Sequence, residues 1–248
     1  PPRRPDVFLQ CDAAAAVATL CSSVTPRQAF GPDGSERLKR WEREAIEATG
    51  DLARYVFAIR DALPDDGIFV NELTQVGYLA RVAFEVRAPR TLIGPGYQGT
   101  LGYSFPTALG AAVGAGGRRV FAISGDGGFG WSYQELATAR RYDLPVTLIV
   151  FTDGYFGNVR GIQRRTFGRE FAVELQNPDF RALGEAFSIP HATAASPATL
   201  EAVLRDTLRE DGPVLVEVPV GEMASPWPLL GLKPLASGGE AVSVLADL

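Results

Sequence analysis

The 248-residue sequence predicts an α/β fold with a doubly wound, mostly parallel sheet and helices on both faces. Two apolar, β-branched runs carry this prediction, residues 120–125 and 146–152, and each ends in a Gly-rich turn that contains an aspartate. The residues between the runs have helical spacing, so we expect a strand–helix–strand unit. Because the carboxyl ends of parallel strands meet at one edge of a sheet, Asp126 and Asp153 are expected to face the same crevice.

Local signals predict the remaining elements of this sheet. Ser132 stands three residues before Glu135, and this capping-box spacing predicts the start of the helix between the two runs. Ser196 followed by Pro197 predicts the start of another helix. We expect helices over 107–115, 180–187 and 197–209, a strand that enters a polar turn over 69–75, and a buried strand over 213–220.

The N-terminal part is expected to belong to a different domain. Residues 6–10 are typical of a strand and residues 12–21 of an Ala-rich helix, and a polar stretch with Pro and Gly follows. This pattern indicates the closing strand and helix of a preceding α/β domain. The expected division is 1–34 for the end of that domain plus a linker, 35–50 for a charged linker helix, 51–230 for the main domain, and 231–248 for a C-terminal tail.

Composition favours a globular protein of the cytoplasm. The formal net charge of −5 argues against nucleic acid as a partner. No apolar stretch reaches transmembrane length, and the charged start is unlike a signal peptide, so no membrane association is expected. Cys11 and Cys21 lie far from the aspartates and lack the spacing of a zinc site, so reduced thiols are expected.

The two aspartate turns indicate a phosphate site, and two kinds of ligand fit them. Two carboxylates beside glycine amides suggest a hard divalent cation that bridges protein to phosphate. However, residues 125–130 also read as G-x-G-x-x-G after a strand, which is the pattern of dinucleotide-binding loops. The Asp126 carboxylate counts against that second interpretation, because it would repel a bare pyrophosphate.

The segment Gly125-Asp126-Gly127, with Asp153 one strand later, resembles the cofactor motif of thiamine diphosphate enzymes. The resemblance implies that the Asp126 and Asp153 side chains and the Tyr155 carbonyl hold Mg²⁺, which in turn holds the cofactor's diphosphate. The family often has Asn where this chain has Asp153. The added negative charge leads us to expect a stronger dependence on the metal.

Two further segments extend the resemblance over roughly residues 50–230. Residues 94–106 resemble the segment that holds the aminopyrimidine ring, and Leu101 matches the apolar residue that supports the bent cofactor. Residues 69–75 resemble the segment that contacts the diphosphate, although Thr74 could simply cap a helix. The cofactor-binding residues implied are Asn71, Glu72, Thr74, Gln75, Gly99, Thr100, Leu101, Gly125, Asp126, Gly127, Gly128, Asp153, Tyr155, Phe156 and Gly157.

Within the family, the chain is most similar to the acetolactate synthase and 2-oxo acid decarboxylase branch, through residues 134–139 and 156–160. This implies a lyase or transferase that decarboxylates a 2-oxo acid, ligates it to a second carbonyl compound, or both. Acetohydroxyacid synthases commonly have Trp where this chain has Ile162, so that particular specificity is not implied.

The resemblance covers the end of a middle domain and all of a diphosphate-binding domain. In the family, the glutamate that activates the cofactor lies on a pyrimidine-binding domain, so no residue here is assigned to catalysis itself. We therefore expect a partner domain or subunit that supplies this glutamate, a heterotetramer or larger assembly, and no activity of the chain alone. The alternatives are a nicotinamide-dependent dehydrogenase domain and a non-catalytic scaffold subunit.

Three further features have two interpretations each. His191, the single histidine, is expected to have a structural or surface role, since no partner is implied by spacing. The arginines at 160, 164 and 165 either steer a carboxylate substrate or form a solvated basic face. Residues 225–230 either fold over the site as a lid or cover the core.

Overall fold

The computed structural model describes residues 7–25, 33–96 and 98–230. The chain divides into two compact units, residues 1–43 and residues 44–248, and each is described by itself. The boundary falls within helix α2 (Gly34–Glu47), where the sequence predicts a charged linker helix. The predicted tail at 231–248 and the polar residues 26–32 lie outside the described residues.

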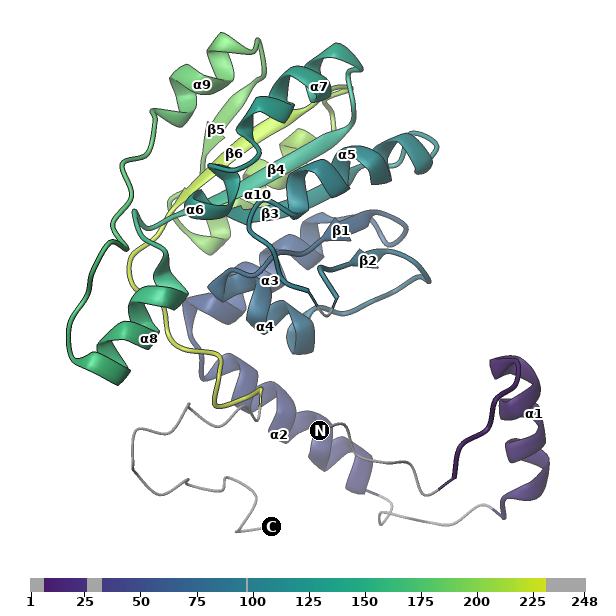
Figure 1. Cartoon of the computed structure of the whole chain (residues 1–248). Helices are drawn as coiled ribbons and strands as arrows, with labels where there is room; N and C mark the ends of the chain where they lie inside the picture. The colour runs from purple at the N-terminus through teal and green to yellow at the C-terminus, as the bar shows by residue number, and fades with distance from the viewer. Residues whose placement is uncertain (1–6, 26–32, 97, 231–248) are drawn as a thin grey trace. The chain divides into compact units, whose positions relative to one another are not determined.

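In the second unit, six strands of the described chain form one sheet in which every pairing is parallel. The strand order is β2-β1-β3-β4-β6-β5 (Figure 1). The bounds are Ile68–Val70 (β1), Leu92–Ile93 (β2), Val120–Gly125 (β3), Val146–Thr152 (β4), His191–Thr193 (β5) and Val214–Pro219 (β6). The α/β fold with a parallel sheet is therefore confirmed.

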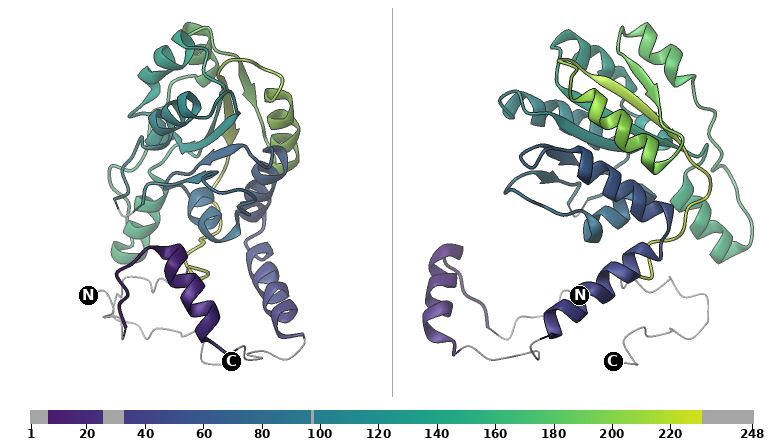
Figure 2. Two further views of the ribbon diagram at one scale, coloured as in Figure 1. Left: turned by 90° about the vertical axis from the view of Figure 1, so that its right-hand side faces the viewer. Right: turned by 180° about the vertical axis from the view of Figure 1, so that it is seen from behind.

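Helices cover both faces of this sheet (Figure 2). One face carries α3 (Asp51–Ala62), α4 (Gln75–Ala83) and α10 (Pro197–Thr207). The other face carries α5 (Ser104–Gly114), α7 (Leu136–Arg141) and α9 (Phe180–Ala186). Along β3, Phe121 and Ile123 belong to the core cluster on the face of α3, α4 and α10. Val120 and Ala122 belong to the core cluster on the face of α5, α7 and α9. Because successive strand residues point to opposite faces, a strand buried on both sides must be apolar throughout.

The order of the strands reverses between β1 and β3. From β1 the chain passes through α4 to β2 at the edge, then returns through α5 to β3 on the other side of β1. Connections that leave neighbouring strands in opposite directions open a crevice at their carboxyl ends, where ligands of such folds bind. Residues 72–74 and the turn at Asp126 both reach this crevice.

The connection after β3 does not begin with the predicted capping box. The chain enters a short helix, α6 (Asp126–Phe129), then a 3₁₀ turn, η1 (Tyr133–Glu135), before α7. The Glu135 N–H donates to the backbone carbonyl of Ser132 rather than to its hydroxyl, and the Glu135 carboxylate accepts a bond from Thr138. The capping-box hydrogen bonds are therefore absent, although Ser132 is the N-cap of η1, so a tight i to i+3 turn starts at the predicted place.

The other helix signals are confirmed. Ser196 accepts a hydrogen bond from the Thr199 N–H at the start of α10, and Asp179 accepts one from Ala182 at the start of α9. Helix α8 (Gly157–Phe167) follows β4. No helix in the described ranges is long and apolar enough to cross a membrane.

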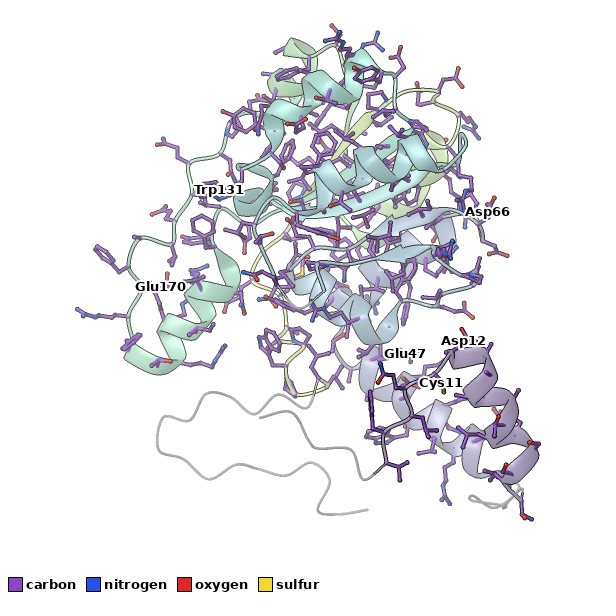
Figure 3. The ribbon with its side chains drawn as sticks, turned by 45° about the vertical axis from the view of Figure 1, so that its right-hand side comes forward. Cys11, Asp12, Glu47, Asp66, Trp131 and Glu170 are labelled. Atoms are coloured by element: carbon purple, nitrogen blue, oxygen red, sulfur yellow. The ribbon has the colours of Figure 1, made fainter. Side chains whose placement is uncertain are left out.

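In the first unit, α1 (Ala13–Ser23) begins where the sequence predicts, with the Asp12 carboxylate accepting bonds from the Ala14 and Ala15 N–H groups (Figure 3). None of the residues of α1 is buried. The strand expected over residues 6–10 is absent from its described part, Val7–Gln10. A strand needs a neighbour for its backbone hydrogen bonds, and these residues have none within the described chain.

Candidate functional site

A cavity of about 320 Å³ lies at the carboxyl ends of β1, β3 and β4. Its walls come from the segments that follow these strands and from the loop before α5. All the predicted cofactor-binding residues except two line it, namely Glu72, Thr74, Gln75, Gly99, Leu101, Gly125, Asp126, Gly127, Gly128, Asp153, Tyr155, Phe156 and Gly157.

The two exceptions are Asn71 and Thr100, which are not part of the cavity wall. The buried Asn71 side chain donates to the Gly77 carbonyl at 2.9 Å and so holds the first turn of α4 against the end of β1. Thr74 caps the same helix, because its hydroxyl accepts a bond from the Gly77 N–H at 2.9 Å. The capping interpretation of Thr74 is therefore confirmed, and Thr74 also lines the cavity.

Asp126 is buried and held by three donors. Its Oδ1 accepts a bond from the Gly127 N–H at 2.9 Å. Its Oδ2 accepts bonds from the Gly154 N–H at 2.8 Å and from the Asn177 amide at 2.7 Å. These donors come from the turns after β3 and β4 and from the segment before α9. The carboxylate is thus fixed in place by three parts of the chain.

Asp153 is less constrained. Its Oδ1 accepts a single bond, from the Tyr155 N–H at 2.9 Å. Burial raises the pKa of Asp153, and the nearby Asp126 carboxylate raises it further, whereas the Tyr155 N–H and Arg160 lower it. Two carboxylates that repel each other at the ends of adjacent strands are the arrangement that a cation relieves.

Gly127 and Gly128, which follow β3, are packed too closely against their neighbours to carry a side chain. A Cβ on Gly127 would lie 2.7 Å from the Phe156 ring, and one on Gly128 would lie 2.9 Å from Glu72 Oε2. Both distances are shorter than carbon atoms tolerate without a shift of their neighbours. The turn therefore presents bare backbone to the cavity, as phosphate-binding loops do.

Glu72 connects the two sides of the cavity. Its Oε1 accepts a bond from the Tyr103 N–H at 2.9 Å, and its Oε2 accepts one from the Ser124 hydroxyl. Burial raises the pKa of Glu72, and these hydrogen bonds oppose that effect. The carboxylate thus ties the loop that carries Leu101 to the end of β3.

Leu101 and Trp131 are exposed although both are large and apolar. Leu101 is 49% exposed and Trp131 is 67% exposed. Leu101 lines the cavity, and Trp131 follows α6 at the surface (Figure 3). Exposed apolar side chains beside a cavity are typical of surfaces that another molecule covers.

The three arginines of α8 differ in their surroundings. Arg160 pairs with Glu170 at 3.0 Å and lies over the Tyr155 ring, 3.7 Å from Cζ to the ring centre. Arg164 pairs with Glu170 and with Glu222, the first of which lies just past α8 (Figure 3). Arg165 lines the cavity and has no ion pair within the described residues.

Two aromatic residues complete the wall: Tyr78, which the sequence did not indicate, and Trp227, which lies in the segment expected as a lid or a cover of the core. Tyr78 of α4 and Trp227 pack together with ring centres 4.4 Å apart, and Asn158 donates to the Tyr78 hydroxyl at 3.3 Å. Leu229 packs against the core beneath α3 and α4. Within residues 225–230, Trp227 thus lines the cavity while Leu229 packs against the core, and the role of the segment as a lid stays a prediction.

His191 lies away from the cavity on β5. Its side chain is 4% exposed, and its Nε2 lies 3.6 Å from the Glu217 carboxylate. Burial lowers the pKa of His191, and Glu217 opposes that effect. The structural role is confirmed, with a partner on the neighbouring strand that sequence spacing could not reveal.

Comparison with known proteins agrees with this geometry. Residues 74–218 match the family described as thiamine pyrophosphate enzyme, C-terminal TPP binding domain. The chain is 31% identical over 217 residues to a probable 2-ketoarginine decarboxylase of Pseudomonas aeruginosa, covering 86% of this chain and 39% of that protein. It is 32% identical over 190 residues to the acetolactate synthase isozyme 2 large subunit of Escherichia coli, covering 76% and 34% respectively.

A solved structure is also similar. The thiamine diphosphate-dependent 4-hydroxybenzoylformate decarboxylase of Rhodococcus jostii RHA1 matches with a TM-score of 0.64 and 27% identity, covering 69% of this chain and 32% of that one. The chain spans between a third and two-fifths of the length of the curated relatives named above. The match over most of the second unit shows that this protein belongs to the thiamine pyrophosphate enzymes, as a C-terminal TPP-binding domain.

Proposed function

We propose that this chain is the diphosphate- and metal-binding part of a thiamine diphosphate-dependent enzyme that acts on a 2-oxo acid. One observation carries the proposal. The carboxylates of Asp126 and Asp153 and the first turns of α4 and α8 all meet at one cavity. Negative side chains and positive helix ends at one place suit a cation and an anion bound together.

The oxygen donors fit Mg²⁺. Asp126 and Asp153 offer carboxylate oxygens, and the Tyr155 carbonyl is the third ligand that the resemblance implies. Mg²⁺ is usually held by one or two carboxylates together with phosphate oxygens. No group of three or more His, Cys, Asp or Glu suited to a metal occurs in the described ranges, so a third protein ligand must be another oxygen.

The helix N-termini fit the diphosphate. The first residues of α8, from Gly157 to Val159, line the cavity, and no side chain caps this helix. Gln75 and Val76 at the start of α4 also line it. Backbone N–H groups of a first turn have no partner within the helix and bind phosphate oxygens readily.

The Leu101 side of the cavity fits an incomplete site. The exposure of Leu101 and Trp131 supports a pyrimidine-binding domain or subunit that covers this surface and supplies the activating glutamate. In this arrangement Leu101 would hold the cofactor in its bent conformation. A heterotetramer or larger assembly is part of the proposal, as is the absence of activity without that partner.

When bound, the cofactor would supply the electron sink that decarboxylation of a 2-oxo acid requires. The residues of this chain hold the diphosphate, shape the substrate pocket and keep it partly apolar. On the substrate side we assign Arg165, because Glu170 and Glu222 neutralise Arg160 and Arg164. The cavity is further bounded there by Tyr78 and Trp227. Both decarboxylation and carboligation suit this pocket.

The dehydrogenase alternative is weaker. The Asp126 carboxylate lies inside the glycine turn where a dinucleotide's pyrophosphate would approach, and it is held there by three donors. A non-catalytic scaffold is also disfavoured, because a scaffold gains nothing from two mutually repelling carboxylates beside a cavity.

Titration of the chain with thiamine diphosphate, followed by calorimetry with and without Mg²⁺, tests the proposal. The wild-type chain is expected to bind the cofactor only when Mg²⁺ is present, and Asp126→Ala is expected to lose this binding. The titration should reach millimolar cofactor, because half of the site lies on the partner. Metal-independent binding of NAD instead would reject the assignment in favour of a dehydrogenase domain.

A further inference from the structure

A short segment crosses the two aspartate turns. In this crossing segment (residues 173–177), the Val173 carbonyl accepts a bond from the Phe156 N–H at 2.8 Å, and the Leu175 N–H donates to the Gly154 carbonyl at 2.8 Å. Tyr155 and Glu174 form an antiparallel bridge between these two bonds. The crossing segment therefore pairs with the turn after β4 like a short strand.

The crossing segment ends on the metal side of the cavity. The Asn177 amide Nδ2 donates to Asp126 Oδ2 at 2.7 Å. Since a carboxylate can only accept hydrogen bonds, the orientation of this amide is determined by its partner. Asn177 does not line the cavity. Any effect that it has on a ligand in the cavity must therefore pass through Asp126.

The donors around Asp126 are distributed unequally between its two oxygens. Oδ2 accepts two hydrogen bonds, from Gly154 and Asn177, which occupy both of its lone pairs. Oδ1 accepts one, from Gly127, and keeps one lone pair available. A cation that approaches this carboxylate therefore finds a single open position.

We propose that Asn177 is a positioning residue that makes Asp126 a ligand through Oδ1 alone. The assignment rests on the proposed metal site. One-oxygen coordination suits Mg²⁺, which demands near-octahedral geometry, whereas Ca²⁺ also accepts carboxylates through both oxygens in its larger, more flexible shells. By occupying Oδ2, Asn177 favours Mg²⁺ over Ca²⁺. Groups that orient a ligand in this way typically change metal affinity when removed.

The fold of the crossing segment does not depend on this amide. The two backbone bonds at Val173 and Leu175 remain when the side chain of Asn177 is cut back. Gln163 of α8 also holds the preceding loop through two bonds to the Phe171 backbone, at 2.8 and 3.1 Å. Asn177→Ala should therefore fold, with Asp126 Oδ2 keeping the Gly154 N–H as its one donor and gaining an open lone pair.

The test uses Mn²⁺ as a spectroscopic probe of the site. Free Mn²⁺ is measured by electron paramagnetic resonance in the full chain with millimolar thiamine diphosphate, and Mg²⁺ or Ca²⁺ is then added as a competitor. Asn177→Ala is expected to weaken Mn²⁺ and Mg²⁺ binding by about 10- to 100-fold and to reduce the preference for Mg²⁺ over Ca²⁺. Asn177→Ser keeps a hydrogen-bond donor, so its metal affinity and selectivity are expected to lie between those of the wild type and those of Asn177→Ala.

A matched control lies two residues away. Asp179 caps α9 through the Ala182 N–H at 2.9 Å and does not contact Asp126 in the described structure. Asp179→Ala perturbs the same stretch of chain, and it is expected to leave metal affinity and selectivity unchanged. Circular dichroism on every variant confirms that it is folded.

Three outcomes would overturn the inference, and they are distinguishable. Unchanged affinity and selectivity in Asn177→Ala would overturn it while the metal site itself stands. An equal loss in Asp179→Ala would assign the effect to the stability of the segment rather than to the amide. A wild-type chain that binds no Mn²⁺ at millimolar concentration would overturn the proposed function, and this assignment with it.

Discussion

The two ends of the cavity are built in opposite ways. At the carboxylate end, Asp126 is 4% exposed, and three donors of the same chain hold it. At the other end, Leu101 is 49% exposed and the neighbouring Trp131 is 67% exposed. One end is therefore organised before any ligand arrives, whereas the other presents apolar surface.

This difference separates stability from binding. A buried carboxylate with three hydrogen bonds contributes to the folded state as well as to a ligand, so a substitution there should affect both. An exposed leucine contributes little to folding, so a substitution there should affect only the complex. The predictions below test this separation, from the largest expected effect to the smallest.

Asp126→Asn should produce the largest effect. An amide nitrogen in place of Oδ2 would face the donors of Gly154 and Asn177, and one in place of Oδ1 would face the Gly127 N–H, so at least one buried hydrogen bond is lost. We expect metal-dependent cofactor binding to fall at least ~100-fold and the free energy of unfolding to fall by about 1–3 kcal/mol. Calorimetry and urea unfolding measure the two quantities. Loss of cofactor binding with an unchanged free energy of unfolding would contradict the view that Asp126 contributes to both.

Leu101→Ala should affect the complex alone. The free energy of unfolding of the chain is expected to stay within about 0.5 kcal/mol of wild type. Activity reconstituted with the pyrimidine-binding partner should fall on the order of 100-fold, because the reacting parts of the cofactor are displaced. Steady-state kinetics of the assembled enzyme and urea unfolding of the chain give both numbers. A marked loss of stability would show that Leu101 is simply core.

Arg165→Gln tests whether the cavity has a separate substrate side. We expect the KM for the 2-oxo acid to rise about 10-fold, which corresponds to the loss of one charge-assisted hydrogen bond. Cofactor affinity should not change. Arg169→Gln is the matched control, since Arg169 is also exposed, lies just past α8 and is not part of the cavity wall. Weaker cofactor binding in Arg165→Gln would instead place this arginine at the diphosphate.

Glu72→Gln tests the residue that connects the two ends of the cavity, and it is expected to change the pH dependence of stability by a small amount. Burial raises the pKa of Glu72 in the folded state, so above the unfolded pKa of about 4.3 the folded state binds more protons than the unfolded state. The free energy of unfolding of the wild type therefore falls as the pH rises from the unfolded pKa of Glu72 through its higher folded pKa. The variant lacks this contribution, so its stability relative to wild type should rise with pH. Urea unfolding from pH 5 to 8 measures the trend, and a constant difference would contradict it.

Sequence alone located the carboxylate end well. The two aspartates follow long apolar runs whose strand character does not depend on distant residues, and each strand end is marked by glycines. The loop that carries Leu101 was found by resemblance, and the structure brings it to the same cavity. These features are local, so a pattern of neighbouring residues was enough to identify them.

Contacts between distant parts of the chain were not predictable. Asn177 contacts Asp126 only because the connection between α8 and α9 turns back across the sheet edge, and its sequence indicates a helix start and nothing more. Trp227 meets Tyr78 for a similar reason. Asn71 was expected at the cavity because its neighbours are there, yet its side chain bonds to α4 instead.

The crossing segment also sets the order in which the carboxylate end can be completed during synthesis. Asp126 precedes its donor Asn177 by 51 residues. At a translation rate of roughly 5–20 residues per second, Asp126 is added to the chain about 3–10 s before that donor. Through this interval the nascent chain carries a carboxylate that lacks one of its native partners. If Asn177 has the proposed positioning role, selective metal binding becomes possible only after the chain has been made well beyond β4.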